Sequence, residues 1–530
     1  MLQDSPVLPG THPILTVDEA LAWEEALFRG DEVREWAAME AAGRALAEAV
    51  ALDALEVGAL PEDGRLLVLC GPGHNGGDAL LATRELLAML PRMSALVIVA
   101  PGFARLRPLA RRAAEALARA AGGRVQWESV AGPAEGRDAQ RVAEMLADRS
   151  FAVCLDGLLG MRCRPPLRGP FDWLIDRVNA HRGILLRAAV DLPSGLGAGS
   201  GAAVFAADFT YATGILKEPV LGRAGAGRIR YLDLGFFDRG EPVATGGRVL
   251  TSGVLAPLGG LRAPGADKRT FGHLFVVSGS RGMPGAVLLA VEAALRSGVG
   301  LVTAFVPESI AELAAVRLPE AMWEPLPETP AGGLALEGRG AVVARAARCT
   351  ALLVGPGLGR ERESQALVEE LLRAIDVPTV LDADALQPEL ALARGGPQAE
   401  APRVFTPHAG ELARLAGGGV VAGQEAALAQ RLGGVLVCKG APTRITDGSR
   451  FYLSPNGGPV LARGGSGDVV AGLIGGLLAQ RGEALEAAAR GVVWHGLAAD
   501  RLARESGQVA VRTSDLFGHL SAVMREVIHA

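Results

Sequence analysis

Short apolar runs recur along this chain, each followed by a turn and then by a helical stretch rich in Ala, Leu and Arg. A strand that is apolar on both faces is typical of a parallel sheet with helices on both sides. The pattern therefore predicts an α/β fold. The predicted strands are residues 65–70, 95–100, 151–156, 185–191 and 228–234, followed by 273–279, 301–307, 351–357, 378–384, 403–408 and 434–440.

The chain is long enough for two domains, with 530 residues of which 49% are hydrophobic. Residues 238–267 are rich in Gly and Pro and contain no long periodic element, so the boundary is expected there. We predict a first α/β domain over residues 1–240, a linker over 241–265 and a second α/β domain over 266–530. A helical segment from about residue 16 precedes the first strand.

Charge and cysteine content exclude several classes of protein. The net charge of −5 comes from interspersed Arg and acidic residues, so no basic stripe for nucleic acid or membrane is predicted. Every long apolar stretch is interrupted, and the N-terminus lacks the basic region of a signal peptide. The five cysteines have no metal-binding spacing and fit a reducing compartment. We expect a cytoplasmic protein.

Lysine and asparagine are scarce, and the few that remain are weak pointers to sites. In a chain that uses Arg for nearly all its cations, a retained Lys suggests a need for a compact charge. These residues are Lys217, Lys268, Lys439, Asn75, Asn179 and Asn456.

Polar residues follow several predicted strands of the first half, where parallel sheets bind ligands. The stretch "GPGHNGGD" (71–78) predicts a tight turn with outward N–H groups, and Asp78 either contacts a ligand or caps the following helix. Asp156, Asp191 and Ser194 end two further strands. With the Asn75 amide they form an oxygen-rich cluster that suits a cation of low charge density, such as a monovalent ion.

The second half places further glycine-rich turns and acids after its strands. Met283–Gly285 and Gly355–Gly359 form turns at the sheet edge, while Asp382 and Asp384 either face a ligand or cap helices. His408 follows a strand within "TPHAGEL", which suggests a ligand contact in place of a structural hydrogen bond. Lys439 also ends a strand, where it can hold a phosphate.

The stretch "GGSGD" (464–468) precedes an apolar helix and combines an anion-binding turn with an acid. Backbone N–H groups at a helix N-terminus bind phosphate, which a carboxylate cannot do. Asp468 therefore fits a base that acts on a hydroxyl approaching the bound phosphate. A turn of this kind resembles that of the ribokinase superfamily.

The motifs "HNGGD", "DGLLG", "VDLPSG" and "TGILK" resemble the NAD(P)H-hydrate epimerase family, with its Rossmann-like N-terminal fold of the YjeF type. The resemblance implies that Asp191 is an acid/base at the nicotinamide C6 and that Asn75, Asp156 and Ser194 bind K⁺. The residues implied to bind the hydrated nucleotide are His74, Asn75, Gly76, Gly77, Asp78, Gly160 and Asp191.

Three features depart from the epimerase pattern. His74 replaces the first Asn of the loop, Ala79 replaces a Gly, and "GMRCRPP" (160–166) replaces the usual continuation. They leave open the alternative that the first domain binds nucleotide without turning it over.

Residues 266–530 resemble the ADP/ATP-dependent NAD(P)H-hydrate dehydratases, which have a ribokinase-like fold. The matching motifs are "KRTFGHLFVVSGSRGMPGA", "GPGLG", "LDADAL", "TPHAGELARL", "CKGAPT" and "GGSGD". The resemblance implies that Ala286, Gly357, His408 and Asp468 contact the hydrate. It implies that Mg²⁺ with ADP or ATP is held by Lys439, Gly440, Ala441, Pro442, Thr443 and Gly467.

Together the two resemblances predict a bifunctional repair enzyme. Because members of these families often oligomerise, a homo-oligomer is expected as well. The first domain would interconvert R- and S-hydrates of NADH or NADPH, and the second would phosphorylate the S-hydrate and eliminate phosphate. The alternative is a ribokinase-type small-molecule kinase with a non-catalytic N-terminal domain. The sequence leaves open whether ADP or ATP is the donor and whether NADH or NADPH hydrate is preferred.

Overall fold

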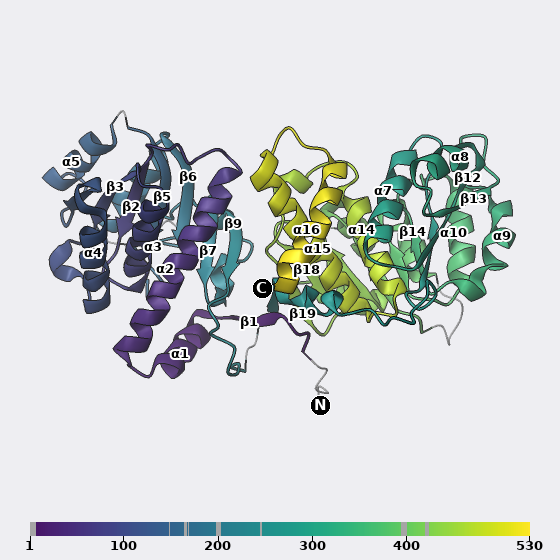
Figure 1. Ribbon diagram of the computed structural model, residues 1–530, viewed down its shortest axis with the longest axis horizontal. Coiled ribbons are helices and arrows are strands. Elements are labelled where there is room, and N and C mark those ends of the chain that lie inside the picture. Colours follow the sequence, from purple (N-terminus) through teal and green to yellow (C-terminus); the bar gives the residue numbers. More distant parts are fainter. Residues whose placement is uncertain are drawn as a thin grey trace. The chain divides into compact units, whose positions relative to one another are not determined.

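The computed structural model describes residues 7–147, 149–163, 167, 169–197, 203–243, 246–393, 400–418 and 423–529. Two compact units emerge (Figure 1). The N-terminal unit comprises His12–Val249 and Ala503–Ala510, and the C-terminal unit comprises Met1–Thr11, Leu250–Leu502 and Val511–Ala530. Each unit combines a sheet with flanking helices, which confirms the predicted two-domain α/β architecture. No described helix is both long and apolar enough to span a bilayer.

The N-terminal unit is built on a parallel sheet of seven strands in the order β4-β3-β2-β5-β6-β7-β9. Its strands are β2 (Arg65–Cys70), β3 (Ser94–Val99), β4 (Val125–Ser129), β5 (Phe151–Gly157), β6 (Ile184–Val190), β7 (Phe209–Thr213) and β9 (Arg228–Leu232). Two short strands outside this sheet, β1 (Thr11–Leu15) and β8 (Leu216–Lys217), pair in parallel. A further strand, β10, covers Arg248–Leu250.

Helices cover both faces of this sheet because its strands are apolar on both sides. In β2, Leu66 and Val68 pack with the helices of one face, and Leu67 and Leu69 with those of the other. The first face holds α2 (Glu32–Leu55), α3 (His74–Met89) and α4 (Pro108–Ala121), and the second holds α5 (Arg137–Leu146) and α6 (Phe171–Ala180). The chain enters this unit through α1 (Val17–Phe28).

The C-terminal unit has strands in the order β13-β12-β11-β14-β15-β16-β17-β18-β19. They are β11 (His273–Val277), β12 (Leu301–Pro307), β13 (Met322–Leu326), β14 (Ala351–Val354), β15 (Thr379–Leu381), β16 (Arg403–Phe405), β17 (Val435–Cys438), β18 (Thr443–Thr446) and β19 (Phe451–Ser454). The strands β11 to β17 pair in parallel, as predicted.

Two strands outside the predicted set, β18 and β19, pair in antiparallel fashion. The turn between them is the cause. Asp447 Oδ1 accepts hydrogen bonds from the backbone N–H groups of Ser449 and Arg450, and Gly448 has a φ of +94° that suits glycine. An Asp-Gly turn of this kind reverses the chain at once, so no crossover helix intervenes.

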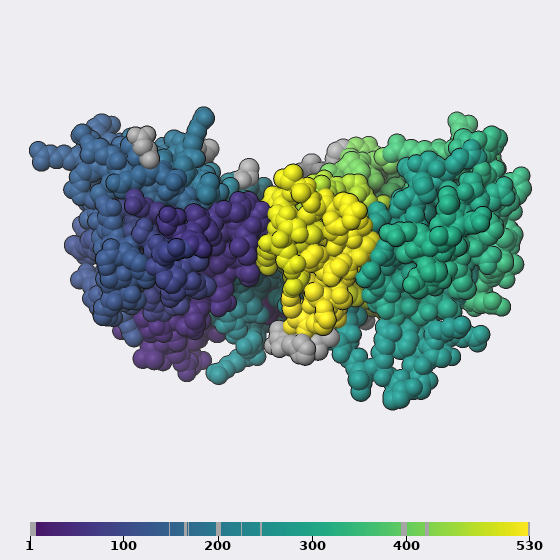
Figure 2. All heavy atoms as spheres, turned by 45° about the horizontal axis from the view of Figure 1, so that its top comes forward, coloured from purple at the N-terminus to yellow at the C-terminus, as the bar shows by residue number. Residues whose placement is uncertain are grey.

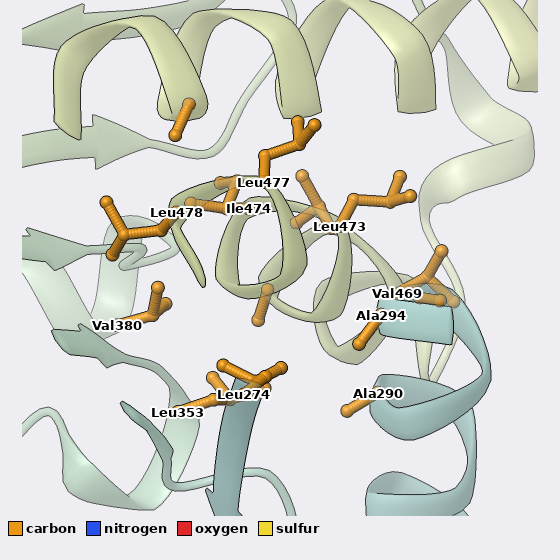
Figure 3. Packing of buried hydrophobic residues seen from close by; sticks show 14 of the residues in the cluster. Leu274, Ala290, Ala294, Leu353, Val380, Val469, Leu473, Ile474, Leu477 and Leu478 are labelled. Carbon is orange, nitrogen blue, oxygen red and sulfur yellow. The ribbon is translucent and has the colours of Figure 1, made fainter. Parts of the chain in front are cut away.

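The helices of the C-terminal unit also occupy both faces of the sheet. They are α7 (Pro284–Arg296), α8 (Glu308–Arg317), α9 (Arg339–Val343), α10 (Arg362–Ala374), α11 (Pro388–Leu392), α12 (Ala409–Ala416), α13 (Glu425–Leu432), α14 (Ser466–Ala479), α15 (Ala484–Ser506) and α16 (Leu516–His529). Figure 3 shows the apolar helix α14 packed among its neighbours, with Leu473 and Ile474 in the same cluster as Leu274 and Leu353 of the sheet. This packing fixes the end of α14 that carries "GSGD".

Close packing of α14 on α7 makes Gly472 sensitive to substitution. A Cβ added there would lie 2.1 Å from the carbonyl oxygen of Ala290. We expect Gly472→Ala to lower the free energy of unfolding of this unit by roughly 1–3 kcal/mol, because the helices must separate. The measurement is the Tm by calorimetry.

Gly518→Ala on α16 is the matched control. An added Cβ meets nothing within 4 Å there, and Ala is the better helix former. Figure 2 shows this C-terminal segment, in yellow, at the surface of its unit. Gly518→Ala should leave the Tm unchanged or slightly raised, and an equal Tm for both variants would contradict the packing argument.

Candidate active sites

In the N-terminal unit, the strand order reverses between β2 and β5, which is where doubly wound sheets bind ligands. The loops after β2 and β5 diverge there, and the loop after β6 lies beside them. A cavity of about 520 Å³ opens at this edge. Predicted residues that line it are His74, Asn75, Gly76, Asp78, Gly160 and Asp191.

Asn75, Asp156 and Ser194 meet as the sequence suggested. Asn75 Nδ2 donates to the carbonyl oxygens of Val190 at 2.9 Å and Leu159 at 3.3 Å. Asp156 accepts from the backbone N–H and the hydroxyl of Ser194, each at 2.7 Å. The Ser194 hydroxyl in turn accepts from the Leu159 N–H at 2.9 Å. One network therefore joins the ends of three strands.

This network fits a monovalent cation. Asp156 is fully buried, and no Lys or Arg of the described ranges pairs with it. Burial raises the pKa of its carboxyl to about 6, against the hydrogen bonds from Ser194. A cation would stabilise the buried carboxylate. The Asn75 Oδ1 lies beside Gly160, where an added Cβ would approach it to 2.6 Å, so only glycine leaves this oxygen accessible.

Asp191 is held in a strained and charged setting. Its φ of +67° is unusual for a residue with a side chain, and such strain is typical of functional sites. The ammonium of Lys217, itself 1% exposed, lies 2.5 Å from Asp191 Oδ1. Thus one of the three scarce lysines is at this site and Lys439 is at the other. Lys268 is exposed, and a site role for it stays a prediction.

The glycines of "HNGGD" do not form the tight turn that was predicted. Helix α3 already begins at His74, so Gly76 and Gly77 are helical. An added Cβ would lie 2.1 Å from the Gly71 carbonyl oxygen at Gly76, and 2.6 Å from Met39 Sδ at Gly77. These glycines let α3 pack closely. Gly77 does not line the cavity, and its contact with substrate stays a prediction.

Asp78 is not a helix cap. The N-cap of α3 is Gly73, and Asp78 is the fifth residue of the helix. Burial, together with the nearby Asp191 and Glu24, raises the pKa of Asp78 well above its usual range. Of the unusual segment 160–166, residues Arg164, Pro165 and Pro166 lie outside the described residues, whereas Met161 and Arg162 line the cavity.

The second candidate site lies at the reversal of strand order between β11 and β14. Gly357, with a φ of +61°, follows β14, and an added Cβ would lie 2.9 Å from the Cβ of Ala286 on α7 and 2.7 Å from the Met283 carbonyl oxygen. The two residues predicted to contact the hydrate are therefore neighbours. Asp384 Oδ2 accepts from the Gly359 N–H at 3.0 Å and fixes this turn.

Lys439 forms ion pairs that link residues at the ends of three strands. Its Nζ lies 2.9 Å from Asp382 Oδ1 and 3.9 Å from Glu411 Oε2. Asp382 also accepts from the Thr406 hydroxyl at 2.7 Å and makes no helix-capping bond. The neighbouring carboxylates raise the pKa of Lys439 despite the opposing effect of burial. Thr443 Oγ1 donates to the Gly440 carbonyl oxygen at 3.0 Å, which shapes the predicted nucleotide loop.

His408 caps a helix. It is the N-cap of α12, where its Nδ1 accepts from the Gly410 N–H at 3.0 Å. Glu411 returns a bond by accepting from the His408 N–H at 2.8 Å, which completes a capping box. The His408 side chain is 60% exposed, and its Nε2 lies 3.4 Å from Glu411 Oε1. A ligand contact of His408 beside this cap stays a prediction.

Asp468 lies at the N-terminus of α14, which begins at Ser466. The turn is therefore shorter than predicted, because Gly467 is already helical. An added Cβ at Gly467 would lie 3.1 Å from Lys439 Nζ, so the ammonium adjoins the helix N-terminus. Burial and then the charge of Asp382 raise the pKa of Asp468 to about 7. A carboxyl with that pKa is suited to proton transfer near neutral pH.

Comparison with known proteins assigns both halves. The family model described as NAD(P)H-hydrate dehydratase matches residues 274–521, and the one described as YjeF-related protein N-terminus matches residues 36–218. A bifunctional NAD(P)H-hydrate repair enzyme of Moorella thermoacetica is 35% identical, with 87% of this chain and 88% of the relative covered. The chain belongs to the bifunctional NAD(P)H-hydrate repair enzymes. The predicted family is thereby confirmed.

Other repair enzymes of this family match over similar lengths. The Escherichia coli relative is 33% identical over 88% of this chain and 86% of its own length. Among solved structures, an ADP/ATP-dependent NAD(P)H-hydrate dehydratase from Bacillus subtilis, co-crystallised with ATP and Mg²⁺, is 30% identical over 50% of this chain and 94% of its own, with a TM-score of 0.43.

Two residues of the N-terminal site were missed as site residues by the motif analysis. Glu24 on α1 and Arg107 before α4 both line the cavity. Glu24 precedes the main sheet, and Arg107 comes several residues after the end of β3, whereas the criterion used to find the others was a position directly after a strand.

Proposed function

We propose that residues 1–240 epimerise the hydrates of NADH and NADPH at C6, and that residues 266–530 dehydrate the S-hydrate at the expense of ADP or ATP. The observation that carries the proposal is the placement of Asp468 at the N-terminus of α14, beside the Lys439 ammonium. Anion-binding groups and a base thus adjoin one another.

The C-terminal site divides phosphate binding and proton removal between different atoms. The backbone N–H groups at the start of α14 and the Lys439 ammonium hold phosphate of the nucleotide. Asp468 accepts the proton of the hydrate's hydroxyl as it attacks the terminal phosphorus. The C6–O bond then breaks with phosphate as the leaving group and C5 loses a proton, which restores the C5=C6 double bond of the dihydronicotinamide. The carboxylates of Asp382, Asp384 and Glu411 influence Asp468, and their oxygens suit Mg²⁺ bound with the nucleotide.

The N-terminal site would use Asp191 in proton transfer at C6, with K⁺ held by Asn75, Asp156 and Ser194. When bound, K⁺ would supply positive charge to the buried Asp156 carboxylate and order the loops that carry Asn75 and Ser194. Asp191 itself is oriented by Lys217, which keeps its oxygen toward one wall of the cavity.

A coupled assay tests the proposed pair of activities. Incubation of the protein with S-hydrate, Mg²⁺ and ADP or ATP should release phosphate and restore the absorbance band of the reduced nicotinamide. R-hydrate should give the same products after epimerisation. A stable phosphorylated hydrate would instead support a kinase, the alternative that the family membership does not favour.

Removal of K⁺ should slow the epimerase selectively. In buffers where tetramethylammonium replaces K⁺, we expect the rate of R-to-S conversion to fall several-fold, because the loops after β5 and β6 lose a shared ligand. Asp156→Asn should abolish the dependence on K⁺. The control is the dehydration of pure S-hydrate, measured in the same samples at the same Mg²⁺ concentration. An epimerase rate that does not change with the cation would contradict the assigned ion site.

A further inference from the structure

Glu24 is a carboxyl group of the N-terminal cavity that belongs to none of the family-like motifs. It lies on α1, whose start is fixed by a capping box between Thr16 and Glu19. The adjacent Trp23 donates from its indole Nε1 to the Phe236 carbonyl oxygen at 3.2 Å, which ties this part of α1 to the other wall residues. Glu24 is therefore held at the cavity by two anchors.

The charges that act on Glu24 come from several elements. Lys217 and Arg162 lower the pKa of its carboxyl, whereas Asp191 and Glu35 raise it. Asp78 on α3 is a further nearby acid, whose own pKa is raised by the charge of Glu24. Burial is the largest effect, and the pKa of Glu24 rises to about 7. Glu24 can therefore hold a proton near neutral pH.

Asp191 lines the same cavity but, unlike Glu24, is ion-paired. The Lys217 ammonium lies 2.5 Å from its Oδ1 and stabilises the carboxylate, whereas no Lys or Arg within the described ranges is ion-paired with Glu24. Asp191 is thus ion-paired with Lys217, whereas Glu24 feels the charge of the same ammonium without an ion pair. Carboxyl pairs whose environments differ in this way divide acid and base roles in enzymes.

We propose that Glu24 is a second catalytic residue of the epimerase, which protonates the leaving hydroxyl while Asp191 serves as the base. The inference rests on the proposed assignment of epimerisation to this cavity. It requires a substrate that presents a hydroxyl at C6 and an adjacent ring nitrogen, N1.

The step balances without any further reactant. The protonated Glu24 gives its proton to the C6 hydroxyl oxygen, the C–O bond breaks, and water leaves while the N1 lone pair forms an N1=C6 double bond. A water molecule then adds to the other face of C6. It gives one proton to the Asp191 carboxylate, and the N1=C6 electron pair returns to N1. Glu24 ends as carboxylate and Asp191 as acid, which is the form that catalyses the reverse reaction.

The test compares Glu24→Gln with wild type in the full-length protein, using R-hydrate and S-hydrate. The amide keeps the size of the side chain and cannot transfer the proton. We expect kcat for epimerisation to fall by roughly 10²-fold or more with little change in KM. Glu24→Asp should restore part of the rate. Dehydration of S-hydrate by the same samples should be unchanged, and Glu48→Gln, on the exposed side of α2, should match wild type in both activities.

The outcomes separate this inference from the proposed site. Loss of epimerisation in Asp191→Asn with a kcat of Glu24→Gln within about twofold of wild type would overturn the role of Glu24 alone. Full rates in both variants would overturn the site. If Glu24→Gln does not fold, the pH profile of Glu24→Asp decides, because the alkaline limb of kcat/KM must shift from its position near pH 7; an unshifted limb rejects the proposal.

Discussion

Asp468→Asn is expected to lower kcat for the dehydration of S-hydrate by roughly 10²- to 10⁴-fold, the usual contribution of a positioned acid or base. The amide cannot accept the hydroxyl proton. The backbone N–H groups of α14 and the Lys439 ammonium remain, so the KM for ADP or ATP should stay within a few-fold of wild type. The measurement is steady-state phosphate release with each nucleotide.

The pH dependence provides an independent check on Asp468. The pKa of its carboxyl is raised to about 7, and the base must be ionised to act. Thus kcat/KM should be low below pH 7, rise through about pH 7 and reach a plateau above it. The residual rate of Asp468→Asn should lack this limb. Glu337→Gln, on an exposed residue of the same unit, is the control. Full turnover by Asp468→Asn would remove this residue from the catalytic role.

The positions of the main site residues follow from the sequence because parallel strands deliver their following residues to one edge. Asp156 and Ser194 are 38 residues apart and share hydrogen bonds, since β5 and β6 are neighbours. Asn75, which follows β2, donates to backbone carbonyl oxygens of the same strand ends. The same logic brings Asp382 and Lys439 together from β15 and β17. Alternation of apolar strands and turns is sufficient for this inference.

The sequence could not place Glu24, because α1 precedes the first strand of the main sheet and reaches the cavity only through tertiary packing. Its one local signal is an acid next to a tryptophan within an amphipathic helix, a pattern shared by many surface helices. Local rules also misjudged where helices begin. Glycine suggests a turn at 76–77, yet close packing of α3 on Gly71 and Met39 selects glycine there instead.

Lys217→Met is expected to have the largest effect on the stability of the N-terminal unit. The substitution keeps an unbranched side chain but removes the ammonium that lies 2.5 Å from Asp191 Oδ1. Both side chains are buried, so Asp191 would lose its compensating charge in a poorly solvated place. Removal of one partner of a buried pair costs roughly 3–5 kcal/mol. We therefore expect a clearly lower Tm for this unit and loss of epimerisation.

The double variant Lys217→Met/Asp191→Asn separates charge from packing. An uncharged amide at residue 191 needs no ammonium, so the double variant should recover most of the stability that Lys217→Met loses while remaining inactive as an epimerase. Equal destabilisation of the single and double variants would show that the packing of the lysine chain, and not its charge, matters. Dehydration of S-hydrate should persist in both, since Lys439 and Asp468 belong to the other unit. Stability and catalysis at Asp191 would then be traced to the same ion pair.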